Sequence, residues 1–495
     1  MRHVVRRSLW LLVVPFLLLG CPGPSAGPSI TVTSHVDGQR VFGSRNVTLS
    51  GTALGVDEVR LRFNGTEVGV VPVTAGAFSI AIVLGDNASD LRVETLDGLV
   101  GVDLELVFPA VDAWTFRPAD VVVGQPTKTA VEVGLSATRF GGNTFASGLF
   151  VNGILYLPDP MNHRILGYLG LPESDGAAAD FVLGQSSFGA NAYNDDDQDG
   201  SPDAAPTART LRSPTGVASD GTRLFVADGA NGRVLIYQQL PTTSFAAADV
   251  VVGQASMSAT AHTACSLDAP IFFARRVAVG GGKLLVTDED GHRVLVWTAI
   301  PTTNGTEPDL VLGQPRSGAT CKPNDANQDG VSGDRSARTL YGPRDAWTDG
   351  SRLLVADTNN ARVLLWQAFP TVSFAPADVV IGQASMTELD SSPSASSMGG
   401  AYGIASNGNQ IAIADYFYKR VLVYNAFPTV NGAAASRVLG QSNFFATTPN
   451  DDNQNGEEDA TPSARTVSWP TGVWMGEGVL LVSDASNRRY LLFVD

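Results

Sequence analysis

The chain has 495 residues, of which 44% are hydrophobic and 17% charged, and its formal net charge is −16. This length and composition indicate a soluble globular protein of more than one domain. The excess of acidic residues argues against nucleic acid and against an anionic lipid surface as partners, because phosphate groups would repel the chain.

The first twenty residues have the pattern of a secretory signal. A basic start precedes a short apolar run, Leu9–Leu19, which ends at Gly20-Cys21,. The stretch Leu18-Leu19-Gly20-Cys21 resembles a bacterial lipobox, and the resemblance implies that residues 1–20 are removed and that Cys21 is lipidated. The alternative is a plain signal peptide with an incidental cysteine. Pro22 after the cysteine favours the outer membrane or cell surface of the bacterial envelope, with the membrane contacted through the lipid anchor only.

Short strands are expected after a spacer rich in Pro and Gly, residues 21–28. Between residues 29 and 110 about seven segments alternate apolar and polar residues, and Asn64-Gly65 predicts a hairpin turn between two of them,. This pattern predicts a β-sandwich and resembles bacterial immunoglobulin-like domains.

A repeat occupies the rest of the chain, residues 113–495. Six short apolar segments end in Gly-Gln, with spacings of 60, 69, 60, 69 and 58 residues, and each precedes a module Asp-x-x-x-x-Arg. The Asp/Arg pairs are Asp159/Arg164, Asp228/Arg233, Asp288/Arg293, Asp357/Arg362, Asp415/Arg420 and Asp484/Arg489. The alternating spacing indicates that a double unit was present three times.

Each unit contains four strand-like segments, so six units predict a six-bladed β-propeller. The modules Val226-Ala-Asp-Gly-Ala-Asn-Gly-Arg-Val and Val355-Ala-Asp-Thr-Asn-Asn-Ala-Arg-Val resemble the NHL repeat. The first Gly-Gln strand lies before the first module, and no such strand follows the last module. We therefore expect Asp120–Gln125 to pair with the C-terminal strands and to close the ring.

The repeated Asp and Arg residues are interpreted as structural, because a catalytic site should break the repeat symmetry. An Asx-type turn is expected at each Asp, and each Arg is expected to bond carboxylates or carbonyls between blades. His163 and His292 occupy one repeat position, and two histidines there cannot form a three-histidine zinc site. No catalytic residue is predicted.

Cys265 and Cys321 follow the Gly-Gln pairs of neighbouring units at similar distances. In an oxidising compartment this placement predicts a disulfide, with two unpaired thiols as the alternative.

Three long loops carry the first half of a calcium-loop pattern, with oxygen side chains at positions 1, 3 and 5 and Gly at position 6,. A further Asp lies at position 9 or 10, and the bidentate Glu of an EF-hand at position 12 is missing. We expect loose, low-affinity structural Ca²⁺ sites of a dockerin-like or thrombospondin-like kind, with acidic linkers as the alternative. The predicted ligands are Asp195, Asp197, Asp199 and Asp203; Asp325, Asn327, Asp329 and Asp334; and Asp451, Asn453, Asn455 and Asp459.

Together these features favour a non-enzymatic, lipid-anchored envelope protein whose propeller binds a protein or a glycan. A lyase or hydrolase acting at the central channel is the main alternative, and an envelope assembly factor is a third. Symmetry-breaking acids or histidines at the channel mouth would favour an enzyme. An exposed aromatic or apolar face would favour binding.

Overall fold

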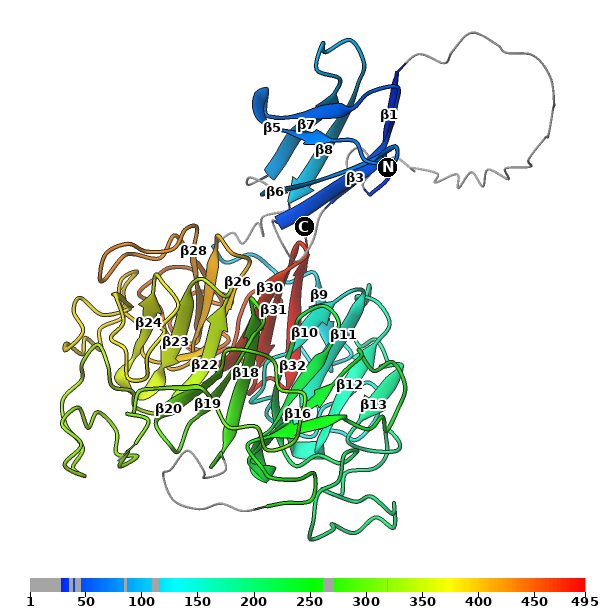
Figure 1. The fold of residues 1–495 in the computed structure, drawn as a ribbon. Helices are drawn as coiled ribbons and strands as arrows, with labels where there is room; N and C mark the ends of the chain where they lie inside the picture. Colours follow the sequence, from blue (N-terminus) through cyan, green and yellow to red (C-terminus); the bar gives the residue numbers. More distant parts are fainter. Residues whose placement is uncertain are drawn as a thin grey trace. The chain divides into compact units, whose positions relative to one another are not determined.

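The computed structural model describes residues 28–34, 39–40, 46–83, 87–108, 115–260, 271–317 and 319–494. They fall into two compact units, the first within residues 28–108 and the second beginning after Phe108 (Figure 1). The regular elements of the described residues are β-strands and three single-turn 3-10 helices, which confirms the all-β class. None of the described helices has the length and apolar character needed to cross a membrane.

The first unit consists of two small sheets. One has the strand order β1-β3-β6, with β1 (Ser29–Val32), β3 (Asn46–Leu54) and β6 (Ala77–Val83). The other has the order β2-β8-β7-β4-β5, with β2 (Gln39–Arg40), β8 (Gly101–Phe108), β7 (Asn87–Glu94), β4 (Glu58–Phe63) and β5 (Thr66–Pro72). Along β4, Val59 and Leu61 are buried and the alternate residues are not, as expected for a sheet with one covered face,. Asn64 and Gly65 both have positive φ, which confirms the predicted hairpin turn,.

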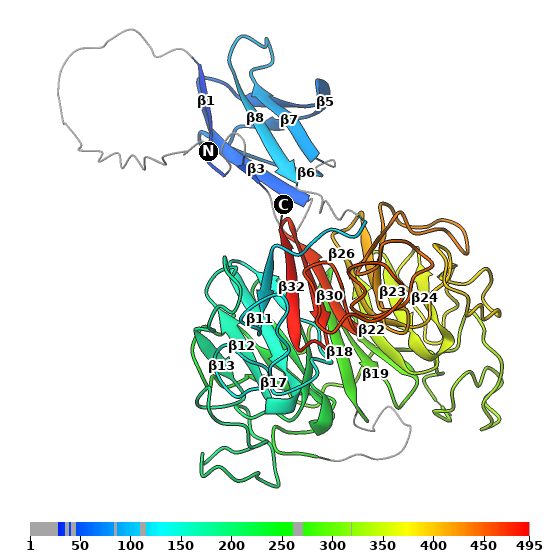
Figure 2. The same ribbon diagram turned by 180° about the vertical axis from the view of Figure 1, so that it is seen from behind.

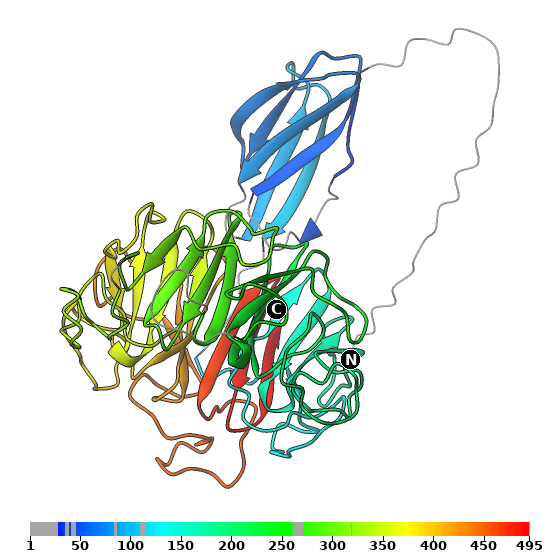
Figure 3. The same cartoon turned by 60° about the horizontal axis from the view of Figure 1, so that its bottom comes forward.

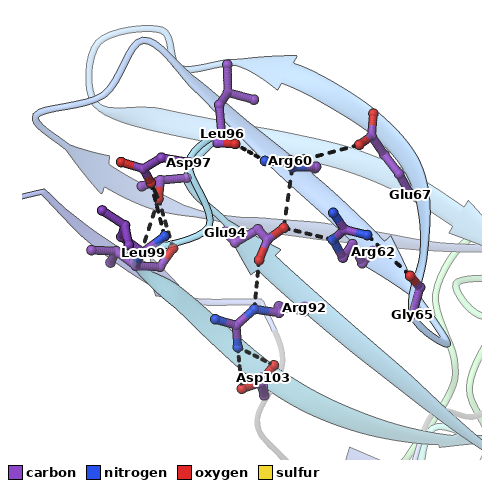
Figure 4. A network of polar contacts seen from close by, with 12 residues as sticks. Arg60, Arg62, Gly65, Glu67, Arg92, Glu94, Leu96, Asp97, Leu99 and Asp103 are labelled. Carbon is purple, nitrogen blue, oxygen red and sulfur yellow. Dashed lines mark hydrogen bonds and ion pairs between the residues drawn. The ribbon is translucent and has the colours of Figure 1, made fainter.

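A charge network covers the other face of the five-stranded sheet (Figure 4). Arg62 and Arg92 each approach the Glu94 carboxylate at 2.8 Å, and Arg60 approaches it at 3.3 Å. Hydrogen bonds from Arg62 and then Arg92 are the main reasons that the pKa of Glu94 is lowered. Arg92 also pairs with Asp103 at 2.6 Å. The network therefore links β4, β7 and β8 through side chains as well as through their backbones.

The second unit is a six-bladed β-propeller, in which each blade is a four-stranded antiparallel sheet. Blade 1 is β10 (Leu149–Val151), β11 (Ile154–Asp159), β12 (Arg164–Tyr168) and β13 (Phe181–Leu183); blade 2 is β14 (Pro214–Ser219), β15 (Leu224–Asp228), β16 (Arg233–Tyr237) and β17 (Val250–Val252); blade 3 is β18 (Ala274–Gly280), β19 (Lys283–Asp288), β20 (Arg293–Trp297) and β21 (Leu310–Leu312). Blade 4 is β22 (Pro343–Thr348), β23 (Leu353–Asp357), β24 (Arg362–Trp366) and β25 (Val379–Ile381); blade 5 is β26 (Ala401–Ser406), β27 (Ile411–Asp415), β28 (Arg420–Tyr424) and β29 (Arg437–Leu439). Figure 3 shows the blades from a third direction, with the colours following the chain around the ring.

Blade 6 combines the two ends of the repeat region. Its strand order is β30-β31-β32-β9, with β30 (Pro470–Gly476), β31 (Val479–Asp484), β32 (Arg489–Val494) and β9 (Val121–Val123). Val122 lies opposite Leu491 in the antiparallel register of β9 and β32. The predicted closure by the first Gly-Gln strand is therefore confirmed, and no outer edge is left without its fourth strand. Figure 2 shows these last strands between the first blade and the fifth.

The blades are held together by apolar faces on both sides of each sheet. Most residues of the two middle strands of each blade are buried, so these strands are continuous apolar runs rather than alternating ones,. One core cluster, for example, joins Phe225 and Ile236 of blade 2 to Val277 and Leu284 of blade 3. The first strands of neighbouring blades contact one another around the axis of the ring.

The repeated Gly-Gln has a steric and a polar reason. Gly382 has φ of +85°, and a Cβ there would lie 2.4 Å from Met398, so this position needs glycine,. Gln383 is buried, and its amide donates to the carbonyl of Ala361 at 2.9 Å, directly before the repeated Arg. The same bond recurs at Gln125, Gln185, Gln254 and Gln441.

The six Asp/Arg pairs are six buried ion pairs, with Nε to Oδ2 distances between 2.7 and 2.9 Å. In blade 4, Arg362 also donates to the carbonyls of Ser336 at 2.9 Å and Thr339 at 3.1 Å, which belong to the crossover from blade 3. Asp357 accepts the N–H of Tyr341 from the same crossover, at 2.7 Å. Each pair therefore fixes the incoming crossover to its blade.

The expectation of an Asx-type turn at the repeated Asp is wrong. Asp159, Asp228 and Asp357 begin 3-10 turns at Pro160–Asn162, Gly229–Asn231 and Thr358–Asn360, and none of the three carboxylates caps its turn. The reason is that both oxygens of each carboxylate already accept hydrogen bonds from the crossover, from the Arg and from the Asn three residues on, as at Asp357.

Candidate functional site

One end of every blade carries both the crossovers and the turns that contain the Asp/Arg pairs. In blade 2 the start of β14 lies opposite the end of β15, since Pro214 pairs with Asp228, and the start of β16 lies beside the end of β17. We call this end the crossover face. The predicted calcium loops lie in crossovers, and each is attached to the turn of the next blade.

The first predicted calcium loop brings three carboxylates together. Oxygen atoms of Asp195, Asp197 and Asp203 lie within 4.8 Å of one another, so this group could hold a metal ion. Asp195 is buried, and its two oxygens accept the N–H groups of Asp199 at 3.2 Å and Gly200 at 3.0 Å. A carboxylate oxygen has lone pairs left after one such bond, so both oxygens can still bind a cation.

The fourth predicted ligand, Asp199, lies outside this group. Its carboxylate accepts the N–H of Ser201 at 2.7 Å. The pKa of Asp197 is raised: the N–H of Asp199 favours its charged form, but the carboxylates of Asp199, Asp203 and Asp195, together with burial, outweigh that bond. Mutual repulsion of this kind is what a bound cation would relieve.

The second and third loops repeat the backbone of the first. The N–H of Gly330 donates to Asp325 at 3.0 Å and that of Gly456 donates to Asp451 at 2.9 Å, and both glycines have φ near +85°. Asp459 accepts the N–H of Asp452 at 2.8 Å, just as Asp203 accepts that of Asp196 at 3.0 Å.

The second loop lacks the carboxylate at position 9, where Gly333 stands. Asp334 comes one residue later. Asn327 donates to Asp329 at 3.0 Å, and in the third loop Asn455 accepts the N–H of Glu457 at 2.8 Å and Asn453 contacts Asp459. Within the described ranges, a metal-sized group of three carboxylates occurs at the first loop alone.

Sequence reasoning missed the residue that attaches each loop. Asn194, directly before Asp195, exchanges amide hydrogen bonds of 3.1 and 2.9 Å with Asn231, and Asn231 also donates to Asp228. The same exchange joins Asn324 to Asn360 and Asn450 to Asn487. The signal was present, because an Asn precedes the first Asp of all three loops. Each loop is therefore connected to the ion pair of the next blade.

The two repeat histidines lie in separate blades, as expected. Nδ1 of His163 accepts the N–H of Ser213 and Nδ1 of His292 accepts that of Gly342, both at 3.1 Å. Burial lowers the pKa of both histidines. Cys321 is disulfide-bonded. Cys265 and Cys21 lie outside the described residues, so the Cys265–Cys321 pairing and the lipidation stay predictions.

The clearest break in repeat symmetry lies at the axis of the ring and was not foreseen. A β-bulge at the start of the first strand leaves one residue unpaired in blades 2 to 6, and a bulge re-aims the side chain at that point,. The bulge residues are Thr215, Arg275, Arg344, Tyr402 and Thr471. The residues after them are Gly216, Arg276, Asp345, Gly403 and Gly472. Blades 3, 4 and 5 thus place large charged or aromatic residues where blades 2 and 6 have Thr and Gly.

Arg276 crosses the axis. From blade 3 its guanidinium donates to the carbonyl of Thr471 in blade 6 at 3.0 Å, to that of Thr215 in blade 2, and to that of Phe145 at 3.5 Å. It passes Gly216, where a Cβ would lie 2.7 Å from the Arg276 side chain. Asp345 is also buried, and burial raises its pKa to about 6 although Arg276 opposes the rise. Arg276 therefore closes the axis at this level.

Further charged and aromatic residues gather beside Arg276, from the same bulges and from the neighbouring turns. Arg275 Nε lies 3.4 Å from Glu289 Oε2, and Arg344 Nη2 lies 2.6 Å from Glu289 Oε1. Tyr402 stacks on Tyr416 with ring centres 3.8 Å apart, and the Trp469 ring lies 4.5 Å from that of Tyr416. We call these six residues the axial cluster: Arg275, Glu289, Arg344, Tyr402, Tyr416 and Trp469.

Trp469 has an unfavourable backbone conformation. Its φ of +61° is in the left-handed region, which a bulky residue rarely adopts,. The equivalent residues before Pro214 and Pro343 are Ser213 and Gly342. All three residues have positive φ, so the repeat requires the left-handed conformation at this position. Blade 6 has a tryptophan there, whereas blade 4 has glycine. Backbone strain at a bulky residue points to a functional position,.

The sheet topology defines the class of the protein as a six-bladed β-propeller with an additional small β-unit. Comparison with models of known protein families gives no match, and comparison with curated proteins gives none either. Solved structures with similar arrangements include the computationally designed Ika8 protein, with 9% identity, 95% of this chain and 97% of that chain covered, and a TM-score of 0.33. Others are a periplasmic gluconolactonase of Pseudomonas aeruginosa (11% identity, 88% and 92% covered, TM-score 0.34) and a glutaminyl cyclase of Myxococcus xanthus (9% identity, 77% and 99% covered, TM-score 0.31). No function is transferred at these identities and scores.

Proposed function

We propose that the protein is a lipid-anchored binding protein of the bacterial envelope, and that its propeller recognises a protein or glycan through the axial cluster. The observation that carries this proposal is the break in symmetry: the bulge position is Thr in blades 2 and 6, but Arg, Arg and Tyr in blades 3, 4 and 5. In a repeat protein the shared residues maintain the fold, whereas the positions that diverge are free to specify a ligand.

The composition of the axial cluster supports binding rather than catalysis. Tyr, Trp and Arg are the residues that dominate recognition surfaces. The nearby acid with a raised pKa, Asp345, is only 5% exposed, and its oxygens accept the N–H groups of Ala346 and Ile404, both at 2.9 Å. It is therefore a poor candidate for proton transfer to a ligand. The neighbouring Phe417, 44% exposed and 5.0 Å from Tyr416, adds an accessible aromatic ring.

The remaining parts of the proposal concern the units that hold the propeller. We assign the NHL type to the propeller because of its Asp/Arg modules, and an immunoglobulin-like type to the first unit, since its order β8-β7-β4 beside a separate β1-β3-β6 sheet agrees with that fold,. Lipidated Cys21 would tether the chain. Ca²⁺ is the cation proposed for the loops, because their donors are carboxylate and amide oxygens.

Capture from native envelope tests the binding function. The calcium-loaded full chain serves as bait together with two variants. One is Phe417→Ser, next to the axial cluster; the other is Val430→Ser, which changes a residue with 63% exposure in the connection between β28 and β29, at the other end of the blade. We expect a partner that is lost with Phe417→Ser and retained with Val430→Ser. Equal capture by both variants would place the binding surface elsewhere, and no capture by the parent would count against a binding role.

A further inference from the structure

Two arginines of the axial cluster have unused hydrogen-bonding capacity. The Nε atoms of Arg275 and Arg344 are buried and make no hydrogen bond among the described residues, although Arg275 Nε lies 3.4 Å from Glu289 Oε2. Their side chains are 12% and 19% exposed, and a single carboxylate, Glu289, lies between them. A guanidinium has several N–H donors, and buried donors in native proteins are nearly always satisfied. The two guanidinium groups therefore keep donor capacity beyond their contacts with Glu289, and their partly exposed ends suit a ligand with acceptor oxygens.

The charge of the arginine site selects the kind of anion. Arg275 and Arg344 bring two positive charges and Glu289 brings one negative charge, so these three side chains have a net charge of +1. A monoanion neutralises it. A phosphate monoester would bring a second negative charge next to Glu289. A carboxylate also matches the planar fork of a guanidinium, which can bind it through two parallel hydrogen bonds.

Aromatic rings border the same site. The Arg344 guanidinium lies 4.1 Å from the centre of the Tyr402 ring, and Tyr402 lies on Tyr416, which contacts Trp469. The Phe417 ring lies 6.1 Å from that of Tyr402, with its own side chain exposed. The faces of aromatic rings are negative, and they attract the C–H groups on the face of a sugar ring. Because the arginines are mostly buried, a narrow group has to reach them, which disfavours a broad protein surface.

We propose that the axial cluster binds a carboxylate carried on a saccharide ring, as in a uronic acid unit of a glycan. This inference rests on the proposed binding function and names the ligand class of that site. Arg275 and Arg344 bind the carboxylate. Glu289 pairs with both guanidinium groups and positions them. Trp469 and Phe417 contact the sugar ring. Arg276 crosses the axis on the side of the cluster away from the crossover face, so the ligand enters from the crossover face.

Titration calorimetry on the full chain tests the proposal. The probes are trimers of galacturonate, glucuronate and mannuronate, the corresponding neutral trimers, and inorganic phosphate. We expect at least one uronate trimer to bind, the neutral trimers to bind at least tenfold more weakly, and phosphate to bind more weakly than the uronate. Arg344→Gln should weaken uronate binding about 10- to 100-fold, the range for a lost charge-assisted hydrogen bond.

Two further variants keep the test independent of folding. Trp469→Gly introduces the residue that blade 4 has at this position and relieves backbone strain, which offsets part of the packing lost against Tyr416, so the variant should still fold while binding uronate at least fivefold more weakly,. Arg338→Gln is the matched control, because Arg338 donates to the carbonyl of Phe374 at an exposed crossover. It should leave the affinity within twofold.

Several results would overturn the assignment: equal affinity for neutral and acidic trimers, tighter binding of phosphate, no effect of either cluster variant, or no binding of any uronate. These outcomes are separable from failure of the binding function itself. If no saccharide binds but envelope capture still depends on Phe417, the ligand class is wrong and the binding site stands. If capture is also absent, both proposals fail.

Discussion

Removing one buried guanidinium should destabilise the whole propeller. In Arg362→Leu the carboxylate of Asp357, which is fully buried, keeps the N–H of Tyr341 and the amide of Asn360 but loses its counter-ion. The carbonyls of Ser336 and Thr339 lose their donor as well. Breaking a buried ion pair from one side destabilises by about 3–5 kcal/mol. For a domain of roughly 380 residues the unfolding entropy converts this loss to about 4–6 °C in melting temperature.

Tryptophan fluorescence during thermal or urea unfolding of the full chain is a suitable assay. Apart from Trp10, every tryptophan lies at or after Trp114, so the signal reports the second unit. Arg223→Leu is the control, since its pair with Asp220 is partly exposed, with side chains 26% and 19% accessible. Such a pair contributes about 0–1 kcal/mol. If Arg362→Leu loses no more stability than Arg223→Leu, the structural role of the repeated ion pairs is refuted.

Three other predictions follow from the loops, the axis and the N-terminus. Ca²⁺ at about ten to a hundred times the dissociation constant should raise the free energy of unfolding by about 1.4–2.7 kcal/mol for each occupied site. Calorimetric unfolding with Ca²⁺ and with chelator measures the gain, which should fall in the double variant Asp195→Ala with Asp197→Ala, and no gain in the parent would leave the loops as acidic linkers. Burial raises the pKa of Asp345 to about 6, so between about pH 4 and pH 6 the folded state holds a proton that the unfolded state has lost, and the stability of the folded state falls as the pH rises through this interval,. Asp345→Asn cannot titrate and should therefore gain up to about 3 kcal/mol on the parent as the pH is raised from about 4 to about 6, whereas a constant difference across pH would contradict the assignment,. Cys21→Ser should release the protein from membranes after a high-salt wash, and continued sedimentation of the variant would refute the lipid anchor.

The propeller could be predicted from the sequence because the same motifs recur once in every blade. Gly-Gln and Asp-x-x-x-x-Arg recur at fixed offsets, and the surplus strand before the first module indicated how blade 6 is completed, as the pairing of Val122 with Leu491 confirms. The group of Asp195, Asp197 and Asp203, which could hold a metal ion, was predictable for the same reason: its oxygen side chains follow a local spacing. Local patterns of this kind need no knowledge of long-range contacts.

The axial cluster could not be predicted, because its members come from different blades. Arg275, Arg344 and Tyr402 are bulge residues with different side chains, so a search for shared residues passes over them. These residues come together only because the ring closes. Arg276, for example, donates both to Thr215, earlier in the chain, and to Thr471, much later in the chain. The residues of the axial cluster stand out only where the aligned blades differ most in the size and charge of their side chains.

A photo-crosslinker placed next to the axial cluster tests whether the propeller binds its partner there. The full chain with a benzophenone amino acid in place of Phe417 is irradiated in native envelope, beside a chain with the same group in place of Val430, which is exposed and lies in the connection between β28 and β29. A binding propeller that uses the axial cluster predicts a discrete crosslinked product from position 417 and none from position 430. Crosslinked products from position 430 alone, or from neither position, would contradict binding through the axial cluster.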